Sequence, residues 1–151
     1  MSLKAEKFDE LMKVMEQNGD RWFTKEELKD ENNTVVYHGR LDIDKQVLPV
    51  FVILDDSAFT YVRVGVTLSP VDGKQETAVL EKLNDLNQSY KVSKYYINEA
   101  DKHVYMDISI PVLQEEFNPG VIVDILTQVI KPHLEETYKD LLAIVKGGKK
   151  Q

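Results

Sequence analysis

The stretch that decides the fold runs from residue 80 to residue 111 and reads LEKLNDLNQSYKVSKYYINEADKHVYMDISIP. Its first third has the apolar spacing of an amphipathic helix. Two strands are predicted after it, at residues 92–97 and 102–110, joined by a polar turn at residues 98–101. In the second strand every other side chain is apolar, which is typical of a strand that buries one face. The stretch therefore predicts a helix followed by a β-hairpin.

A helix is predicted before this stretch, near the N-terminus, because apolar residues recur there at helical spacing. They are Phe8, Leu11, Met12 and Met15, and Asn18-Gly19 follows them as a left-handed cap. The pattern of residues 21–33 is ambiguous. Thr24 and Glu27 have the spacing of a capping box, which permits a short helical turn there.

Three consecutive strands are predicted at residues 34–43, 47–54 and 59–68, where apolar residues alternate with others. Polar turn residues separate the strands, since aspartate and serine side chains bond readily to their own backbone. Pro49 lies near the start of the second strand. A proline cannot donate to a ladder, so its presence favours an edge or bulged position for that strand.

Two more helices complete the pattern, one at residues 74–90 and one that begins at Asn118-Pro119 and ends near residue 145. Pro132 is expected to kink the last helix, because it removes a backbone donor. The order is α-β-β-β-α-β-β-α, which predicts one α+β domain, an antiparallel sheet with helices packed against it. The domain spans residues 1–151, with a core at about 4–146 and a disordered tail at 147–151.

Bulk properties narrow the class of protein. The chain of 151 residues is 42% hydrophobic and 30% charged, carries a net charge of −7 and has no cysteine. An acidic chain disfavours binding to nucleic acid and to anionic membranes. No apolar run approaches the roughly 20 residues of a membrane span, and the charged N-terminus does not resemble a signal peptide. We therefore expect a cytoplasmic protein without disulfides.

No catalytic or metal-binding pattern is present. The three histidines, His38, His103 and His133, are not at metal-ligand spacing. Asp42, Asp44, Asp55 and Asp56 lie at strand ends and are interpreted as turn residues rather than as a weak calcium site. Phosphate loops and nucleophile elbows are also absent from the sequence. We expect no enzyme, no cofactor and no bound metal.

The segment Leu83–Asn87 ends a helix and precedes a strand, a polar turn and an alternating strand that closes with Ile110-Pro111. With this element order from Phe8 onward, the chain resembles the bacterial YbjN family, which shares its fold with the chaperones of type III secretion. The resemblance implies a small, acidic, cytoplasmic and usually dimeric protein that binds extended segments of client proteins. YbjN-like proteins are often labelled sensory-transduction regulators.

The second and third strands of the predicted sheet have more apolar residues than one buried face needs. With a turn at Asp56-Ser57, Phe51 and Ile53 share one face with three valines. The opposite face then carries Val50, Val52, Leu54, Phe59, Tyr61 and Arg63. This second face is interpreted as a protein interface. The alternatives are that another helix covers it, or that the register is off by one residue.

The last helix has a second apolar surplus at residues 121–130, including Ile122 and Ile125. Core packing explains such a helix, and so does packing across a dimer. Four tyrosines around the hairpin suit an interface or the rim of a core (Tyr90, Tyr95, Tyr96 and Tyr105). Asn84 and Asn87 are expected to cap the helix or to bond the turn after it.

These observations favour a non-enzymatic protein-binding module, a homodimer that acts as a chaperone-like adaptor or regulator. Short segments of a partner protein would bind to the apolar sheet face, and a free strand edge would add backbone pairing. The alternative is a small-molecule-binding regulatory domain, with the same face folded over a pocket. A third interpretation is a structural or stress protein whose dimer buries the face.

Overall fold

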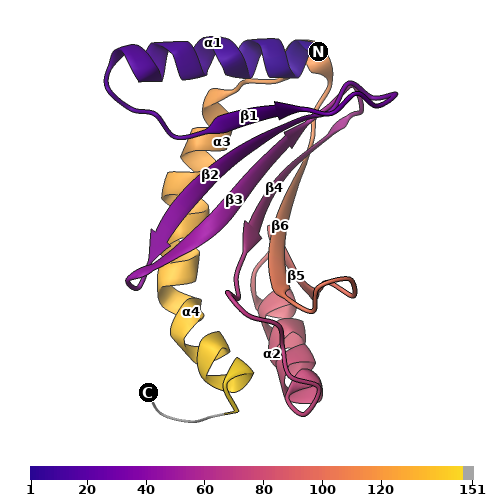
Figure 1. Cartoon of the computed structure of the whole chain (residues 1–151), viewed down its shortest axis with the longest axis vertical. Helices are drawn as coiled ribbons and strands as arrows, with labels where there is room; N and C mark the ends of the chain where they lie inside the picture. Colours follow the sequence, from indigo (N-terminus) through magenta and orange to yellow (C-terminus); the bar gives the residue numbers. More distant parts are fainter. Residues whose placement is uncertain (148–151) are drawn as a thin grey trace.

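The computed structural model describes residues 1–147 and contains a six-stranded antiparallel sheet with helices on one side (Figure 1). The predicted α+β class is confirmed. The expected disordered tail at 147–151 lies, apart from Gly147, outside the described residues. In chain order the elements are α1 (Leu3–Gln17), β1 (Thr24–Glu27), β2 (Val35–Ile43), β3 (Gln46–Leu54), β4 (Phe59–Gly65), α2 (Glu76–Ser89), β5 (Ser93–Ile97), β6 (Val104–Pro111), η1 (Gln114–Glu116), α3 (Gly120–Ile125), η2 (Leu126–Ile130) and α4 (Lys131–Val145).

The strands lie in the order β1-β2-β3-β4-β6-β5. Tight turns join β2 to β3 and β3 to β4, so these strands form the expected meander. The chain then leaves the sheet through α2 and returns as β5, at the far edge, before β6 fills the place beside β4. Both β5 and β6 were predicted to within two residues of their bounds at either end.

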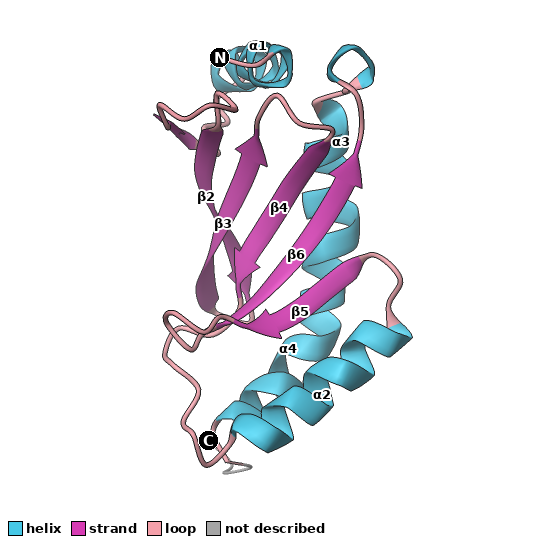
Figure 2. Ribbon diagram, turned by 90° about the vertical axis from the view of Figure 1, so that its right-hand side faces the viewer, coloured by secondary structure: helices cyan, strands magenta, loops and turns pink. Residues whose placement is uncertain are grey.

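The two faces of the sheet differ in what covers them. All helices of the described chain pack on one face, which we call the helix face; the other, the open face, carries none of them (Figures 1 and 2). The buried strand residues on the helix face include Val35, Tyr37, Leu48, Val50, Val52, Leu54, Val62, Val64, Met106 and Ile108. The hydrophobic core therefore lies between the sheet and the helices.

Residues 24–27 form strand β1 and not the short helical turn that the capping-box spacing permits. All four side chains of this strand are exposed, so side-chain burial does not hold it in place. Its backbone pairs with β2, from Thr24 opposite His38 to Glu27 opposite Val35. Just before the strand, the Phe23 ring packs edge-on against Phe8. These long-range contacts outweigh the weak local preference for a helical turn.

Pro49 lies in a central strand, because β3 pairs with β2 on one side and with β4 on the other. The expectation of an edge strand is wrong. The ladder between β3 and β4 runs only from Val50 to Ile53 on the β3 side, so Pro49 lies just outside it. The neighbouring position in β4 is Gly65, whose missing side chain leaves room for the proline ring. A Cβ there would lie 2.8 Å from the ring of Pro49.

The last helical run changes its hydrogen-bond pattern instead of breaking at Pro132. A π-helical turn, η2, joins α3 to α4 and ends two residues before the proline. A wider turn at this point tolerates the missing donor and the bulk of the ring. The buried residues recur at every fourth position, Ile122, Leu126, Ile130, Leu134 and Tyr138. An α-helix has about 3.6 residues per turn, so residues repeating at every fourth position would gradually turn away from the sheet. The wider π-helical turn counteracts this rotation.

Helix α2 packs against β5 and α4 through Val79, Leu83 and Leu86. Asn87 in its last turn reaches across to β5. The side-chain amide of Asn87 donates to the carbonyl of Tyr95 at 3.1 Å, and its oxygen accepts from the Tyr95 amide at 2.7 Å. Asn87 therefore bonds the strand rather than the turn that was expected.

Candidate protein-binding surface

The open face carries the side chains that alternate with the core residues of the strands. In the ladder between β3 and β4, Val52 pairs with Val62 and Ile53 pairs with Tyr61. The face assignment made from the sequence is therefore off by one residue. Val50, Val52 and Leu54 belong to the core and are at most 2% exposed.

Phe59, Tyr61 and Arg63 lie on the open face, as expected, but their neighbours there are Phe51 and Ile53.

An apolar patch occupies the middle of the open face. It consists of Val36, Phe51, Ile53 and Tyr61, all of them half-buried, with the more exposed Phe59 at one end. Val36 is the cross-strand neighbour of Ile53, and Ile53 is the neighbour of Tyr61, so the patch crosses three strands. The edge of the His38 ring meets Phe51, with the ring centres 5.4 Å apart. These side chains are accessible in the chain on its own.

A polar network borders this patch on β4, β5 and β6. The Arg63 guanidinium donates two hydrogen bonds to Asp107, at 2.8 and 3.0 Å. The Tyr96 hydroxyl donates to the same carboxylate, 3.2 Å from each of its oxygens. The rings of Tyr96 and Tyr105 are stacked, and the Lys94 ammonium lies 5.6 Å from the centre of the Tyr96 ring. The network holds these five side chains in defined positions on the open face.

Arg63 and Asp107 form the ion pair of this network. The Asp107 side chain is only 5% exposed and the Arg63 side chain is 35% exposed. Hydrogen bonding to Asp107 raises the pKa of Arg63, so the guanidinium is charged at any physiological pH. Burial, assisted by the Asp107 carboxylate, raises the pKa of Tyr96 to about 12, so its hydroxyl stays protonated and remains a donor. Arg63 presents a fixed positive charge beside the apolar patch.

The two interface candidates in the last helix have different surroundings. Ile122 is fully buried in the core, and Ile125 is half-buried. The exposed apolar residues of this region are Val121 and Val129, at 37% and 41%. Most of the apolar surplus at residues 121–130 is thus accounted for by packing against the sheet.

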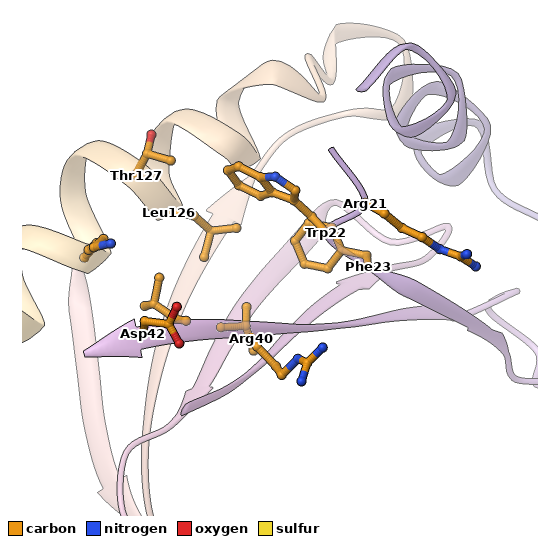
Figure 3. Close-up of a pocket in the computed structure, with 10 residues that line it drawn as sticks. Arg21, Trp22, Phe23, Arg40, Asp42, Leu126 and Thr127 are labelled. Carbon is orange, nitrogen blue, oxygen red and sulfur yellow. The ribbon is translucent and has the colours of Figure 1, made fainter. Parts of the chain in front are cut away.

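A groove of about 370 Å³ lies beside the outer edge of β2 and was not expected from the sequence. Its walls come from the loop before β1, from β2 and from η2 (Figure 3). Trp22 and Leu126 flank the groove, while the charged ends of Arg21 and Arg40 point away from it (Figure 3). The one sequence signal for this site is Trp22, the single tryptophan of the chain, and its side chain is 38% exposed in the structure.

The three histidines lie far apart in the fold and serve separate contacts. His38 lies 3.0 Å from Glu26 on β1, and His103 contacts the carbonyl of Thr67 at 2.9 Å. His133 is hydrogen-bonded to the Tyr95 hydroxyl at 2.6 Å. Within residues 1–147, no group of three or more histidine, aspartate or glutamate residues is placed to hold a metal ion.

The aspartates at the strand ends have different roles. Asp44 lies in the turn after β2 with a positive φ of 51°. Asp55 accepts hydrogen bonds from the amide and the hydroxyl of Ser57, at 2.9 and 2.6 Å, as expected of a turn residue. The Asp56 carboxylate accepts from the Asn33 side chain at 2.7 Å. Asp42 is not in a turn but in β2, opposite Val47.

Comparison with known proteins bears on the fold. No family model and no curated protein matches the chain. Among solved structures, the chain is similar to one chain of the ExsC–ExsE complex, with 15% identity and a TM-score of 0.57, over 93% of this chain and 97% of that one. A chain of the HopA1–SchA chaperone–effector complex matches at 14% identity and a TM-score of 0.39, over 93% and 91% of the two chains.

The first of these similarities shows a shared fold. The antiparallel-sheet α+β architecture predicted from the sequence is confirmed, and one chain of the ExsC–ExsE complex has a similar fold. No helix in the described part of the chain is long and apolar enough to cross a membrane.

Proposed function

We propose that this protein is a non-enzymatic, chaperone-like adaptor that binds extended segments of partner proteins on the open face of its sheet. One observation carries the proposal: an apolar patch lies at the centre of a six-stranded sheet, on the face that no helix of residues 1–147 covers. Contiguous exposed apolar surface of this kind marks a site of interaction. The similar fold of a chain from the two-protein ExsC–ExsE complex supports a protein as the partner.

The physical basis of binding is an apolar centre with a polar border. Phe51, Ile53 and Tyr61 offer area that is removed from water when a segment lies across them. Arg63 is positioned by Asp107 before any partner arrives, so little side-chain entropy is lost when it bonds a carbonyl or a carboxylate of the segment. Interfaces with such anchors and a polar rim are typical of specific protein binding.

Three finer points belong to the proposal. We propose that the protein is a homodimer and that it works in the cytoplasm as a regulator of its partner. We also propose membership of the YbjN family, which the element order and the segment Leu83–Asn87 support.

Affinity purification from the native cytosol, with partners quantified by mass spectrometry, tests the proposal. Wild-type protein is compared with Tyr61→Glu, which places a charge in the patch, and with Val14→Glu on the exposed side of α1, where the side chain is 53% exposed. We expect a specific partner with the wild type and with Val14→Glu, and at least a tenfold loss with Tyr61→Glu. Equal recovery with all three proteins would contradict binding on the open face.

A further inference from the structure

The outer edge of β2 is only partly paired. Strand β1 covers β2 from Val35 to His38, and within residues 1–147 the remaining five residues, 39–43, have no partner strand on that side. Before β1, the chain turns onto the helix face, where the Phe23 ring lies against Gly39. Residues 40–42 of this edge line the groove beside Trp22 (Figure 3). An unpaired edge of this kind is a template for another strand.

The other edges of the sheet are not available in the same way. The middle of β5 is closed by Asn87, whose side chain bonds both the amide and the carbonyl of Tyr95. Strand β1 has four exposed residues, and three of them are charged (Lys25, Glu26 and Glu27). A short, charged edge strand resists pairing with another chain. The edge at residues 39–43 combines open backbone groups with an apolar residue, Leu41.

The sequence of this edge, Gly39-Arg40-Leu41-Asp42-Ile43, is complementary to itself. When two copies pair antiparallel about a two-fold axis at Leu41, Arg40 of each copy lies opposite Asp42 of the other. Residues opposite each other in such a pair share one face, so both ion pairs form on the open face. Moving the axis by one residue places Arg40 opposite Arg40, or Asp42 opposite Asp42, and like charges then repel.

Both charges lack a partner within the described part of the chain. Among residues 1–147, neither Arg40 nor Asp42 takes part in an ion pair or a side-chain hydrogen bond, and both are exposed. Leu41 is half-buried and lines the groove with Trp22 and Leu126. In the antiparallel pair, Leu41 of one copy meets Leu41 of the other, with opposing Cα atoms about 4.5–5.5 Å apart.

We propose that a second copy of this chain occupies the free edge of β2, so that two sheets join into one through residues 39–43. Charge complementarity favours a second copy as the occupant. The edge carries one positive and one negative side chain, and a two-fold axis at Leu41 places each of them opposite the other. This inference specifies the homodimer of the proposed function, on which it rests, but it uses none of the open-face patch. The joined sheet places the open faces of both copies side by side.

The pairing of five residues is a small contact compared with a stable obligate interface. We therefore expect a reversible dimer whose formation depends on protein concentration and weakens with salt, since its charge pairs are exposed to solvent.

A charge swap on the full-length protein tests the register. Sedimentation velocity measures self-association of the wild type, Arg40→Asp, Asp42→Arg and the double variant that carries both changes. Each single variant places like charges opposite each other twice, so we expect dimer dissociation constants at least tenfold higher, a change of about 1.4 kcal/mol. The double variant restores opposite charges in the reverse order and is expected to dimerise like the wild type.

A cysteine scan gives a second measurement, because the natural chain has no cysteine. Leu41→Cys lies on the proposed axis, where the spacing of opposing strands suits a disulfide. Leu113→Cys, at a residue that is 61% exposed and outside the sheet, is the control. We expect Leu41→Cys to form a cross-linked dimer much faster under mild oxidation, and more slowly when Arg40→Asp is added.

The outcomes separate this proposal from the proposed function. A wild-type protein that stays monomeric at several hundred micromolar overturns the edge dimer. Arg40 and Asp42 would then be charges that prevent the edge from pairing with another strand. A dimer that the single variants leave unchanged, or that the double variant fails to restore, overturns it as well. If the dimer is lost in Arg40→Asp while partner capture survives, the edge is confirmed and the open-face site stands independently.

Discussion

Lys4 is a fully buried lysine in the first turn of α1. Its ammonium donates to the carbonyl of Ser57 at 2.7 Å and to the Thr60 hydroxyl at 3.1 Å. Burial lowers the pKa of Lys4, and the acidic side chains of the neighbouring turn counteract that effect. The hydrogen bonds of the Lys4 side chain thus connect the N-terminal helix to the turn between β3 and β4.

Replacement of Lys4 by methionine keeps the volume of the side chain but removes its donors. We expect a loss of about 1–3 kcal/mol in the free energy of unfolding, since buried acceptors are left unsatisfied. Urea unfolding measures it, with Lys13→Met on the exposed part of α1 as the matched control. If both variants unfold at the same urea concentration as the wild type, the role given to Lys4 is wrong.

We expect His133 to make the stability of the fold depend on pH. Burial lowers the pKa of this imidazole below its ordinary 6.5, and Glu136 partly opposes the shift. The Tyr95 hydroxyl and the Tyr90 ring also contact it. As the pH falls through about 6.5, the unfolded chain takes up a proton that the folded chain does not yet accept. Stability that is present above this pH is therefore lost below it.

We expect the wild type to be less stable at pH 5.5 than at pH 7.5, and His133→Gln to show a smaller difference. The urea midpoints of both proteins at the two pH values give the comparison. Carboxylates that titrate in this range are present in both proteins, so their contribution cancels. Identical pH dependence in the two proteins would rule out His133 as a source of the effect.

The two faces of the sheet predict opposite responses to a charge. Ile108 is 2% exposed on the helix face, so Ile108→Glu buries an unpaired carboxylate and is expected to cost about 3–5 kcal/mol. Tyr61 is half-buried on the open face, where a carboxylate reaches water, so Tyr61→Glu is expected to cost about 1 kcal/mol or less. Urea unfolding of the two variants side by side measures both. Equal, severe destabilisation would mean that the open face is part of a core.

At the scale of elements, the register between β3 and β4 shows the limit of sequence reasoning. A two-residue turn at Asp56-Ser57 would pair Ile53 with Thr60, but the structure pairs Ile53 with Tyr61. Ser57 is held by Asp55 in the middle of the connection, which adds one residue to the turn. Because side chains alternate in a strand, a slip of one residue moves the whole set to the other face.

Local patterns predicted most of the other elements. Strong alternation identified β2, β3 and β6, and cap residues located the helix ends to within a few residues. Strand β1 and the groove beside Trp22 depend on contacts between distant parts of the chain. The spacing of apolar residues along the sequence gives no information about such contacts. The open-face candidates Phe59, Tyr61 and Arg63 were found, but Phe51, Ile53 and the partner of Arg63, Asp107, required the observed register.

Asn87 connects two elements and carries a further prediction. Its side chain is the acceptor and the donor for the backbone of Tyr95, so α2 and β5 are fixed to each other at one point. We expect Asn87→Ala to lower the free energy of unfolding by about 1–2 kcal/mol and to speed amide exchange at Tyr95. Asn84→Ala, one turn earlier on an exposed position, is the control. Unchanged exchange at Tyr95 would contradict the link.

For the whole molecule, the asymmetry of its two faces is the central feature. Helices bury one face of the sheet, and the other combines an apolar patch with a fixed arginine. The chain carries a net charge of −7, yet the border of the patch presents Arg63 and Lys94. Under the proposed function, a partner segment with apolar residues and an acidic or carbonyl group at the right distance would match this surface.

The most direct test is cross-linking in living cells with a photoreactive amino acid in place of Tyr61, compared with the same replacement at Val14 on α1. The account predicts a cross-link from position 61 to one extended segment of a partner protein, identified by peptide mass spectrometry, and none from position 14. It also predicts that the cross-link persists when Arg40→Asp is added. A partner that cross-links from position 14 but not from position 61 would contradict the account, because binding would then occur on the helical side.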